Sequence, residues 1–599
     1  MIGNGTAHNG LHAGSNLLAS GVATISVSSA LPTISNAGTV VDGTTETSDD
    51  GSTNGGTWGT GGTVGTASTA LATINRPTVQ LAGTSSVATG LAIAASNVTV
   101  RGIAISGFGT GGGTTSGDIT VSGSSTSGTK IVNDVIGTSA TAFSSGNGAG
   151  GNGIAVSGSG GGTIQNNMLG YMSGSPIALT TTSGWTISGN EIRSAQGSSS
   201  YAGIALASTT GSTVSGNLIA GNPASGIAAS GTTGSLTIQN NTISGNGISI
   251  AGTAPTQTPG IALVGSANII SQNIITANYG AGILVANGST QNTISQNSIF
   301  ANGTIAAANG AAASGEIGID LEGSGDAGGT GTAPFITPNR SGGVGTGGDN
   351  LFNFPIVDAA SIVNGNLIFT GYARAGATIE IYVADTTPAS GFGQGKTYLT
   401  TSATGTYANP STYTVPGGNT SVGTDTANRF LFSLPAPSNV SVGSLLTAIE
   451  YLAADGTSEF GPNVLVGSTP PGPVIATVLS VSPSGVQAPG TALTYTGLFT
   501  NSGVMPAQNV SIVDPIPANT DFQLGSVSAT GKNLTYTVQY SNDANLATSS
   551  WTYTPASGAG GAPANYDRTV TGVKFTFSGT LDFNSPNNTG SFSLSVRIQ

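Results

Sequence analysis

Four carboxylates near residue 320 are the residues of this sequence whose types and spacing most favour chemistry. They are Glu316, Asp320, Glu322 and Asp326. Calcium prefers oxygen ligands, so three or four carboxylates at this spacing could bind it. Asp320 and Glu322 lie on the same side of an extended strand, as alternate residues do. The alternative is a solvated acidic strand at the exit of a repeat region, and the sequence leaves both interpretations open.

Catalysis would need more than this cluster offers. Glycoside hydrolysis uses paired carboxylates on one face, and proton transfer needs a positioned acid and base. Glu191 and Arg193 flank the inward Ile192, which predicts an ion pair on the surface. We therefore expect a protein that is not an enzyme, with no catalytic residue and no resident cofactor except calcium at the acidic cluster. Between residues 97 and 322 the remaining charged side chains are Arg101, Asp118, Lys130 and Asp134.

The composition excludes several classes of partner. Charged residues are 6% of the 599, against a usual share of about 25%. With 12 Lys and Arg and a net charge of −12, the chain has no basic patch for nucleic acid. The absence of cysteine excludes disulfides and cysteine-bound metals. No run approaches the ~20 apolar residues of a transmembrane segment.

A repeated phrase, I-x-x-N-x-I, supplies the elements that must position these residues. Each copy reads as a short strand, a bend at Asn and another short strand, which is the unit of a parallel β-solenoid. The amide of each Asn can hydrogen-bond the Asn of neighbouring coils, as in stacked parallel strands. We call this series the Asn ladder, and its members are Asn167, Asn190, Asn217, Asn241, Asn273 and Asn297.

The coils have a second marker and a predicted handedness. A Gly-Ile pair such as Gly203-Ile204 alternates with the ladder phrase, as two sides of one coil must. Asp134 takes the ladder position one coil before Asn167. Gly and Asn permit corners with positive φ. Parallel strands connected in this way are expected to wind to the right.

The pattern divides the chain into five parts. We predict an irregular lead-in at 1–20, a parallel β-helix at 21–325 and a linker at 326–350. Within the helix, a Gly/Ser/Thr stretch at 47–72 reads as a loop that leaves the solenoid. Period-two alternation between turn residues then predicts two β-sandwiches, at 351–468 and 475–599. The predicted fold class is all-β.

Three sets of motifs carry resemblances to known families. Val135-Ile-Gly-Thr and Gly318-Ile-Asp-Leu resemble phrases of bacterial right-handed parallel β-helix repeat proteins. Ser390-Gly-Phe-Gly-Gln-Gly-Lys-Thr-Tyr-Leu resembles the Ig-like domain that often follows such helices. Ala507-Gln-Asn-Val-Ser-Ile-Val-Asp-Pro-Ile-Pro is similar to the DUF11-type surface repeat. These resemblances imply a right-handed β-helix followed by two Ig-like domains at the cell surface, and they imply no reaction.

The functional expectation is a structural protein of the bacterial cell exterior. An open solenoid end exposes strand edges that need covering. We therefore expect the chain to bind copies of itself head to tail, as a filament, fibre or surface layer. The alternatives are a carbohydrate-active or carbohydrate-binding β-helix and an adhesin stalk, with cell-envelope polysaccharide as a further partner. The residues after Met1 lack the features of a signal peptide, so we expect a secreted chain whose leader has been removed or is unrecorded.

Overall fold

The computed structural model shows an elongated all-β chain. It describes residues 21–45, 54–109, 116–144, 150–193, 201–248, 258–307, 310–340, 342–386, 391–403, 407–412, 426–468, 472–503, 505–583 and 586–599, with backbone only between 402 and 429. The expected lead-in at 1–20 and residues 46–53 lie outside this description. No helix in the described ranges has the length and apolarity needed to cross a bilayer.

Three parallel sheets run along the solenoid, and each coil contributes one short strand to each sheet. The first sheet contains β2 (Val40–Asp42), β9 (Thr99–Arg101), β12 (Lys130–Val132), β15 (Thr163–Gln165), β18 (Thr186–Ser188), β21 (Thr213–Ser215), β24 (Thr237–Gln239), β27 (Ile269–Ser271) and β30 (Thr293–Ser295). The second contains β1 (Ala23–Ser26), β7 (Val79–Ala82), β10 (Ile103–Ser106), β13 (Val135–Ile136), β16 (Met168–Gly170), β19 (Glu191–Arg193), β22 (Leu218–Ala220), β25 (Thr242–Ser244), β28 (Ile274–Thr276) and β31 (Ser298–Phe300). The third contains β8 (Thr89–Ile93), β11 (Gly117–Ser122), β14 (Asn152–Ser157), β17 (Ile177–Thr180), β20 (Ile204–Ala207), β23 (Ile227–Ser230), β26 (Ile261–Leu263), β29 (Ile283–Val285) and β32 (Ile319–Leu321).

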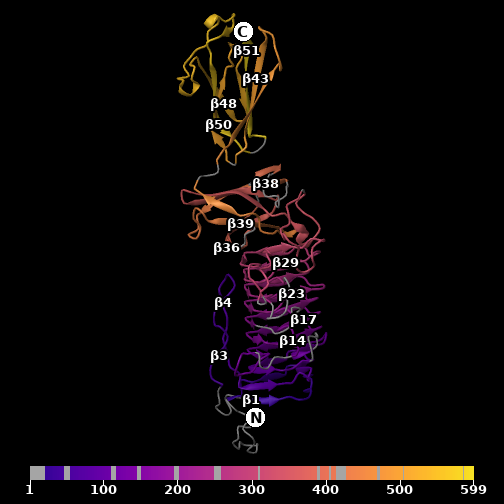
Figure 1. The fold of residues 1–599 in the computed structure, drawn as a ribbon. Helices are drawn as coiled ribbons and strands as arrows, with labels where there is room; N and C mark the ends of the chain where they lie inside the picture. Colours follow the sequence, from indigo (N-terminus) through magenta and orange to yellow (C-terminus); the bar gives the residue numbers. More distant parts are fainter. Residues whose placement is uncertain are drawn as a thin grey trace, which may run out of the picture.

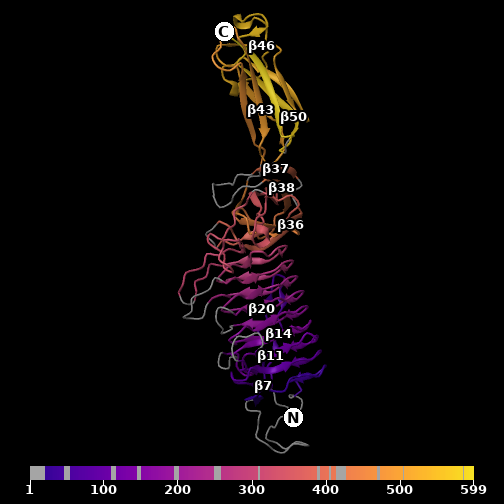
Figure 2. The same cartoon turned by 90° about the vertical axis from the view of Figure 1, so that its right-hand side faces the viewer.

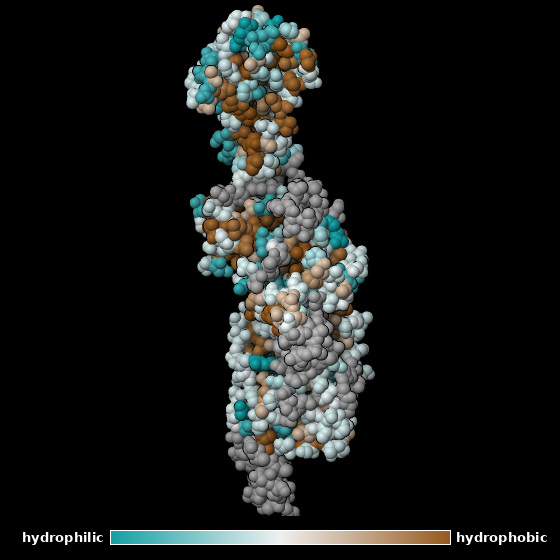
Figure 3. Space-filling model, in the orientation of Figure 1, coloured by the Kyte–Doolittle hydropathy of each residue, from teal (hydrophilic) through white to brown (hydrophobic). Residues whose placement is uncertain are grey.

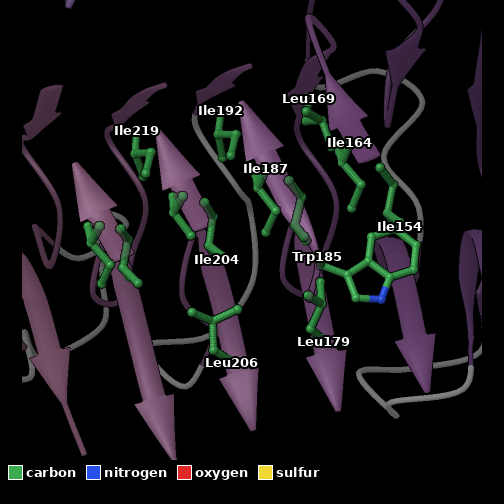
Figure 4. Packing of buried hydrophobic residues seen from close by; sticks show 14 of the residues in the cluster. Ile154, Ile164, Leu169, Leu179, Trp185, Ile187, Ile192, Ile204, Leu206 and Ile219 are labelled. Atoms are coloured by element: carbon green, nitrogen blue, oxygen red, sulfur yellow. The ribbon is translucent and has the colours of Figure 1, made fainter. Parts of the chain in front are cut away.

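The solenoid core is a stack of identical apolar positions. Ile164 pairs in register with Ile187, and Ile187 with Val214, each fully buried. Removing an Ile side chain from water stabilises the fold by about 1.5–3 kcal/mol, so the stack supplies most of the driving force. Trp185 is fully buried in this core, close to Leu179 (Figure 4). The alternation of apolar and small polar residues therefore places one side chain of each first-sheet strand inside, and two side chains of third-sheet strands such as β20, Ile204 and Leu206.

The ladder corners, where the first sheet turns into the second, differ from expectation in one detail. The positive φ belongs to the residue before each ladder Asn and not to the ladder Asn itself. Asn166, Asn240, Gln272 and Gln296 have φ between 55° and 56°. Gly189 and Gly216 take the same position at 65°. The left-handed residue makes the bend, which leaves the ladder Asn free to point inward.

A hairpin leaves the solenoid at one of these corners. It follows β2 and consists of β3 (Thr57–Trp58), β4 (Thr63–Val64), β5 (Thr69–Ala70) and β6 (Ile74–Asn75), with β3 paired to β6 and β4 to β5. We call residues 54–76 the hairpin. Figure 1 shows it standing beside the stack, with β4 further from the N-terminal end than β3. The expected loop at 47–72 thus does leave the solenoid, but its described part is paired and docked.

A middle domain follows the last coil. After the short 3-10 helix η3 (Gly348–Leu351), its strands pair in the order β36-β35-β39-β41-β33-β34-β38-β37, with β40 beside β39. Their bounds are β33 (Ile356–Val363), β34 (Asn366–Ala373), β35 (Thr378–Ala384), β36 (Gly395–Ala403), β37 (Tyr407–Thr412), β38 (Thr426–Pro435), β39 (Leu445–Leu452), β40 (Gly456–Thr457) and β41 (Val464–Gly467). Phe369 and Phe430 lie in its own core, packed edge to face.

The C-terminal domain has two sheets around a separate core rich in Phe. Their strands are β42 (Ile475–Ser482), β43 (Ala492–Asn501), β44 (Ala507–Gln508), β45 (Ser511–Pro515), β46 (Thr520–Gln523), β47 (Ser528–Gly531), β48 (Leu534–Ser541), β49 (Tyr566–Asp567), β50 (Gly572–Leu581) and β51 (Thr589–Ile598), with 3-10 turns η5 (Leu546–Thr548) and η6 (Ala559–Gly561). In Figures 1 and 2 the solenoid, middle domain and C-terminal domain follow one another along one long axis.

Candidate functional site

The ladder asparagines form one chain of side-chain hydrogen bonds. Nδ2 of Asn190 donates to Oδ1 of Asn217 at 3.0 Å, and Asn217 donates to Asn241 at 2.9 Å. The same link joins every neighbouring pair from Asn167 to Asn297. All six side chains are at most 2% exposed. Each amide also bonds backbone groups at the corner, so it satisfies donors and acceptors that no strand pairs.

Asp134 starts this ladder. Its backbone N–H donates to Oδ1 of Asn167 at 2.9 Å, and its own Oδ1 accepts from Ile103 N at 3.0 Å. The side chain is fully buried, and that burial raises its pKa to about 8. The structure therefore places Asp134 in the ladder position that its place in the phrase suggested.

Two further ladders run along the other corners. The second joins Asn222, Asn246, Asn278 and Asn302, and the third joins Asn268 to Asn292. Our reading of the sequence missed both, although the signal is present. Members of the second ladder follow a ladder Asn by five residues, and members of the third precede one by five.

Residues of the following segment and domain complete these ladders at the last coil. Nδ2 of Asn302 donates to Gln394 Oε1 at 2.9 Å, and Nδ2 of Asn292 donates to Asp349 Oδ1 at 2.9 Å. Thr457 Oγ1 accepts from Ile294 N at 2.9 Å and donates to Asn292 O at 2.9 Å. Side chains beyond the solenoid thus take the place of the next coil.

The hydrophobic core also continues across this junction. Tyr382, Ile449 and Phe460 of the middle domain belong to the same buried cluster as the solenoid isoleucines, and each is at most 5% exposed. The Tyr382 and Phe460 rings pack edge to face at 5.5 Å. The C-terminal end of the solenoid is therefore covered by its own chain. This end needs no neighbouring subunit to cover it, because Asp349 of the predicted linker docks there, and head-to-tail contact between copies of the chain stays a prediction.

The four carboxylates predicted as a calcium site lie at this covered end. Glu322 Oε2 accepts from Asn287 N at 2.9 Å, and Asp326 Oδ2 accepts from Gly323 N at 2.5 Å. Glu316 and Asp320 are 1% and 2% exposed. No group of the described residues donates a hydrogen bond to either oxygen of Glu316 or to Oδ2 of Asp320. The middle domain adds Glu459, whose oxygens accept from Leu321 N and Thr337 N.

This arrangement corrects both expectations for the cluster. Across the described residues, no group of three or more Asp, Glu or His side chains converges on a position where a metal could bind. Backbone N–H groups of Asn287 and Gly329 donate to Glu322, and that of Gly323 donates to Asp326. The strand is not solvated either. Burial raises the pKa of Glu316 to about 9 and that of Asp320 to about 7, so Glu316 keeps its proton at neutral pH.

Glu191 and Arg193 do form the predicted ion pair, but Glu191 is 3% exposed and not on the surface. The hairpin covers it, and Glu191 Oε2 accepts from Thr60 N at 2.8 Å. Trp58 donates from Nε1 to Ala140 O at 3.3 Å, and the Arg76 guanidinium lies 4.4 Å from the Trp58 ring centroid. The base of the hairpin is thus fixed by a buried carboxylate and an indole.

The hairpin tip docks further along the same ladder corner. Thr66 N donates to Gln272 O at 2.9 Å, and Ala67 N donates to Asn240 Oδ1 at 3.1 Å. Hollows remain between the hairpin and the corner, and two of them lie toward the tip. One of about 370 Å³ lies beside Thr69 and Ala70. The other, of about 490 Å³, lies between the tip, the last two coils and β36, and we call it the terminal pocket.

Comparison with known families agrees with the coil geometry. A family model described as the right handed beta helix region matches residues 138–299. The matched residues lie within the part of the chain that forms three parallel sheets, so the solenoid is a parallel β-helix. Comparison with curated proteins finds no match.

Similarity to solved structures is low in overall superposition. A tailspike protein of Escherichia coli O157:H7 bacteriophage CAB120 is 12% identical, with a TM-score of 0.28, over 70% of this chain and 59% of that one. A surface adhesin of Streptococcus pneumoniae is 14% identical, with a TM-score of 0.26, over 36% and 60%. The DFA-IIIase of Arthrobacter chlorophenolicus A6 is 15% identical, with a TM-score of 0.26, over 41% and 58%. This chain therefore spans about three fifths of each of these structures.

Proposed function

We propose that this protein is a non-enzymatic structural protein of the bacterial cell exterior that works as a stiff stalk. The observation that carries the proposal is the continuity of the solenoid core into the middle domain, through Tyr382, Ile449 and Phe460. Ladders that end on Gln394 and Asp349 support it further, because a joint held by buried amides and rings resists bending. Within this proposal, residues 351–468 and 475–599 are the Ig-like and DUF11-type modules suggested by their motifs.

The composition supports a place outside the cell. A chain with 6% charged residues and no cysteine keeps its solubility through hydroxyl and amide groups and needs no oxidative folding. Most of the solenoid surface in Figure 3 is correspondingly near neutral in hydropathy.

Assembly with copies of the same chain remains part of the proposal, through other surfaces than the covered coil end. The edge strand β42 is one such surface. Val478 is 67% exposed and Leu479 is 53% exposed, and β42 lies at one end of its sheet. A strand that pairs on one side only and carries no charge is a ready template for a second chain. Hydrophobic side chains along the C-terminal domain are visible in Figure 3.

Small-angle X-ray scattering and negative-stain microscopy of the full chain test the stalk. Ten strands of the second sheet at ~4.8 Å each make the solenoid roughly 45 Å long, and the two domains extend that axis. We expect particles of one length whose solenoid and middle domain stay collinear. A variable angle at that junction would contradict the proposal. So would cleavage of pectin or alginate that Asp320→Ala abolishes.

A further inference from the structure

The terminal pocket is built from three parts of the chain that are distant in sequence. Thr66 at the hairpin tip forms one wall, Gln272 and Gln296 at the ladder corner form the floor, and Lys396 and Tyr398 of β36 form the other wall. Its volume of about 490 Å³ falls within the range of small-ligand sites. The docking of the hairpin and the covering of the last coil therefore create a hollow that neither part forms alone.

The floor offers unused amides. Gln272 and Gln296 adopt φ of 56° and 55°, a conformation that is costly for Gln and fixed here by the corner. Their backbone groups bond Thr66 and Glu380, whereas their side-chain amides have no hydrogen-bond partner in the described part of the chain. Each such amide supplies two N–H donors and one oxygen acceptor, which suits the hydroxyl groups of a sugar.

The wall adds one charge and one ring. The Lys396 ammonium lies 5.2 Å from the Phe300 ring centroid, and no carboxylate among the described residues pairs with it. It is one of 12 basic residues in a chain of net charge −12. Tyr398 is half-buried, with its hydroxyl 2.6 Å from Thr401 Oγ1, so it presents a fixed aromatic surface to the pocket. A lone ammonium beside amides and a ring favours a ligand that has both hydroxyls and an anionic group.

We propose that the terminal pocket binds an acidic saccharide, with the sugar carboxylate on Lys396, ring hydroxyls on Gln272 and Gln296, and a ring face against Tyr398. The site is independent of the stalk proposal, because a stalk needs no ligand. It would give the stalk a point of attachment to an acidic polysaccharide near the joint between solenoid and middle domain.

Saturation-transfer NMR titrations of the full chain test this site with three probes: tetragalacturonate, cellotetraose and a tetraglutamate peptide. We expect tetragalacturonate to bind most tightly, because it alone offers both ring hydroxyls and carboxylates. Lys396→Gln should weaken it about tenfold or more, as expected for the loss of a charge-assisted hydrogen bond. Gln272→Glu should also weaken it, by placing a like charge on the exposed corner.

Lys574→Gln is the matched control, since the Lys574 ammonium lies 5.8 Å from the Trp551 ring centroid in the C-terminal domain. It should leave the affinity unchanged. The proposal is overturned if tetragalacturonate does not bind, or if Lys396→Gln and Gln272→Glu bind it as the unaltered protein does. If tetraglutamate binds as tightly as tetragalacturonate, the site recognises negative charge alone and the saccharide assignment is overturned.

Discussion

At the scale of single residues, each ladder Asn serves three coils at once. Asn241 Oδ1 accepts from Asn217, one coil earlier, through both N and Nδ2 at 3.0 and 2.9 Å. Its own Nδ2 donates to Val214 O and to Asn273 Oδ1, each at 2.9 Å. Because the side chain is fully buried, water cannot replace these partners. The ladder therefore specifies the register between coils as well as the fold of each corner.

Replacing one ladder residue should be costly. Asn241→Ala leaves the buried N–H of Asn217 without its acceptor and removes a hydrogen bond from each of Asn217 Nδ2, Val214 O and Asn273 Oδ1, at about 1–3 kcal/mol for an unsatisfied buried group. We expect the free energy of unfolding, measured by guanidinium titration, to fall by about 2–5 kcal/mol. Gln239→Ala, at an exposed position two residues away, should change it by less than about 0.5 kcal/mol. Equal effects of the two substitutions would contradict the ladder's role.

The buried carboxyl pair should make stability depend on pH. Glu316 and Asp320 have folded-state pKa values of about 9 and about 7, against ordinary values of 4.5 and 3.8. Such groups are protonated in both states at low pH. Above about pH 4.5 the unfolded chain gives up protons that the folded chain keeps, so stability falls as pH rises toward about 9.

We expect the guanidinium midpoint of the unaltered protein to be higher at pH 5 than at pH 9. Glu316→Gln removes the larger of the two pKa shifts. The guanidinium midpoint of this variant should therefore fall less between pH 5 and pH 9 than that of the unaltered protein. The variant should also exceed the unaltered protein in stability at pH 9, since it has no proton to lose. An identical fall in both proteins would contradict a protonated Glu316.

At the scale of elements, the hairpin depends on close backbone contact with the ladder corner. Gly65 has φ of 66°, and a Cβ there would fall on Asn240 Oδ1 and within 2.6 Å of its Cα. Gly65→Ala should therefore lift the tip from the corner while leaving the solenoid core intact. Hydrogen exchange at the Thr66 and Ala67 amides should accelerate by about tenfold or more, as expected when a local opening becomes easier.

Gly62→Ala provides the control for this prediction. A Cβ at Gly62 meets no atom within 4 Å, and the residue lies in the same hairpin. Its exchange pattern should match that of the unaltered protein. If Gly65→Ala leaves the Thr66 amide as protected as before, the tip is held by contacts other than those at Asn240 and Gln272.

The elements differ in how far sequence predicts them. The I-x-x-N-x-I phrase predicts the coils because one inward Ile and one buried Asn recur at fixed positions. The docking of the hairpin leaves no such signal, since Thr66 and Ala67 bond through backbone N–H groups that every residue has. The predicted linker at 326–350 is rich in Gly and Thr, and nothing in that composition points to a contact with the solenoid. The structure shows that Asp349 accepts a hydrogen bond from Asn292 and so continues the third ladder.

Much the same holds for the candidate sites. The spacing of Asp320 and Glu322 predicted that both lie on one strand, whereas β32 (Ile319–Leu321) includes only Asp320, and spacing says nothing about burial. The middle domain supplies Glu459 and helps to bury the cluster. The carboxyl groups of Glu316 and Asp320, predicted as exposed calcium ligands, are therefore buried acids with raised pKa values. The terminal pocket was equally hidden, because its three walls meet only after the hairpin and β36 have docked.

At the scale of the whole molecule, the shared core predicts two unfolding units in three domains. Phe460 is 5% exposed within the solenoid core, whereas Phe592 is 4% exposed within the separate C-terminal core. Phe→Ala in a core costs about 3–5 kcal/mol. We expect Phe460→Ala to lower the midpoint temperature of the calorimetric transition in which the solenoid and the middle domain unfold together.

Phe592→Ala serves as the counterpart. This substitution should lower only the midpoint temperature at which the C-terminal domain unfolds. The midpoint of the transition shared by the solenoid and the middle domain should not change. A Phe460→Ala protein whose solenoid melts at its usual temperature, apart from its middle domain, would contradict a joint unit.

The reach of the hairpin has a consequence for the order in which the chain folds. The contact between Thr66 and Gln272 spans 206 residues, so the tip has no docking site until the coils up to β28 have stacked. Coils can add one after another through local pairing, which is fast, whereas this closure waits for a distant partner. On a chain that emerges from its N-terminus, the hairpin tip would stay undocked while six or more coils form. Its late docking then reports that the intervening coils have the correct register, because a missing coil would place the wrong corner beneath the tip.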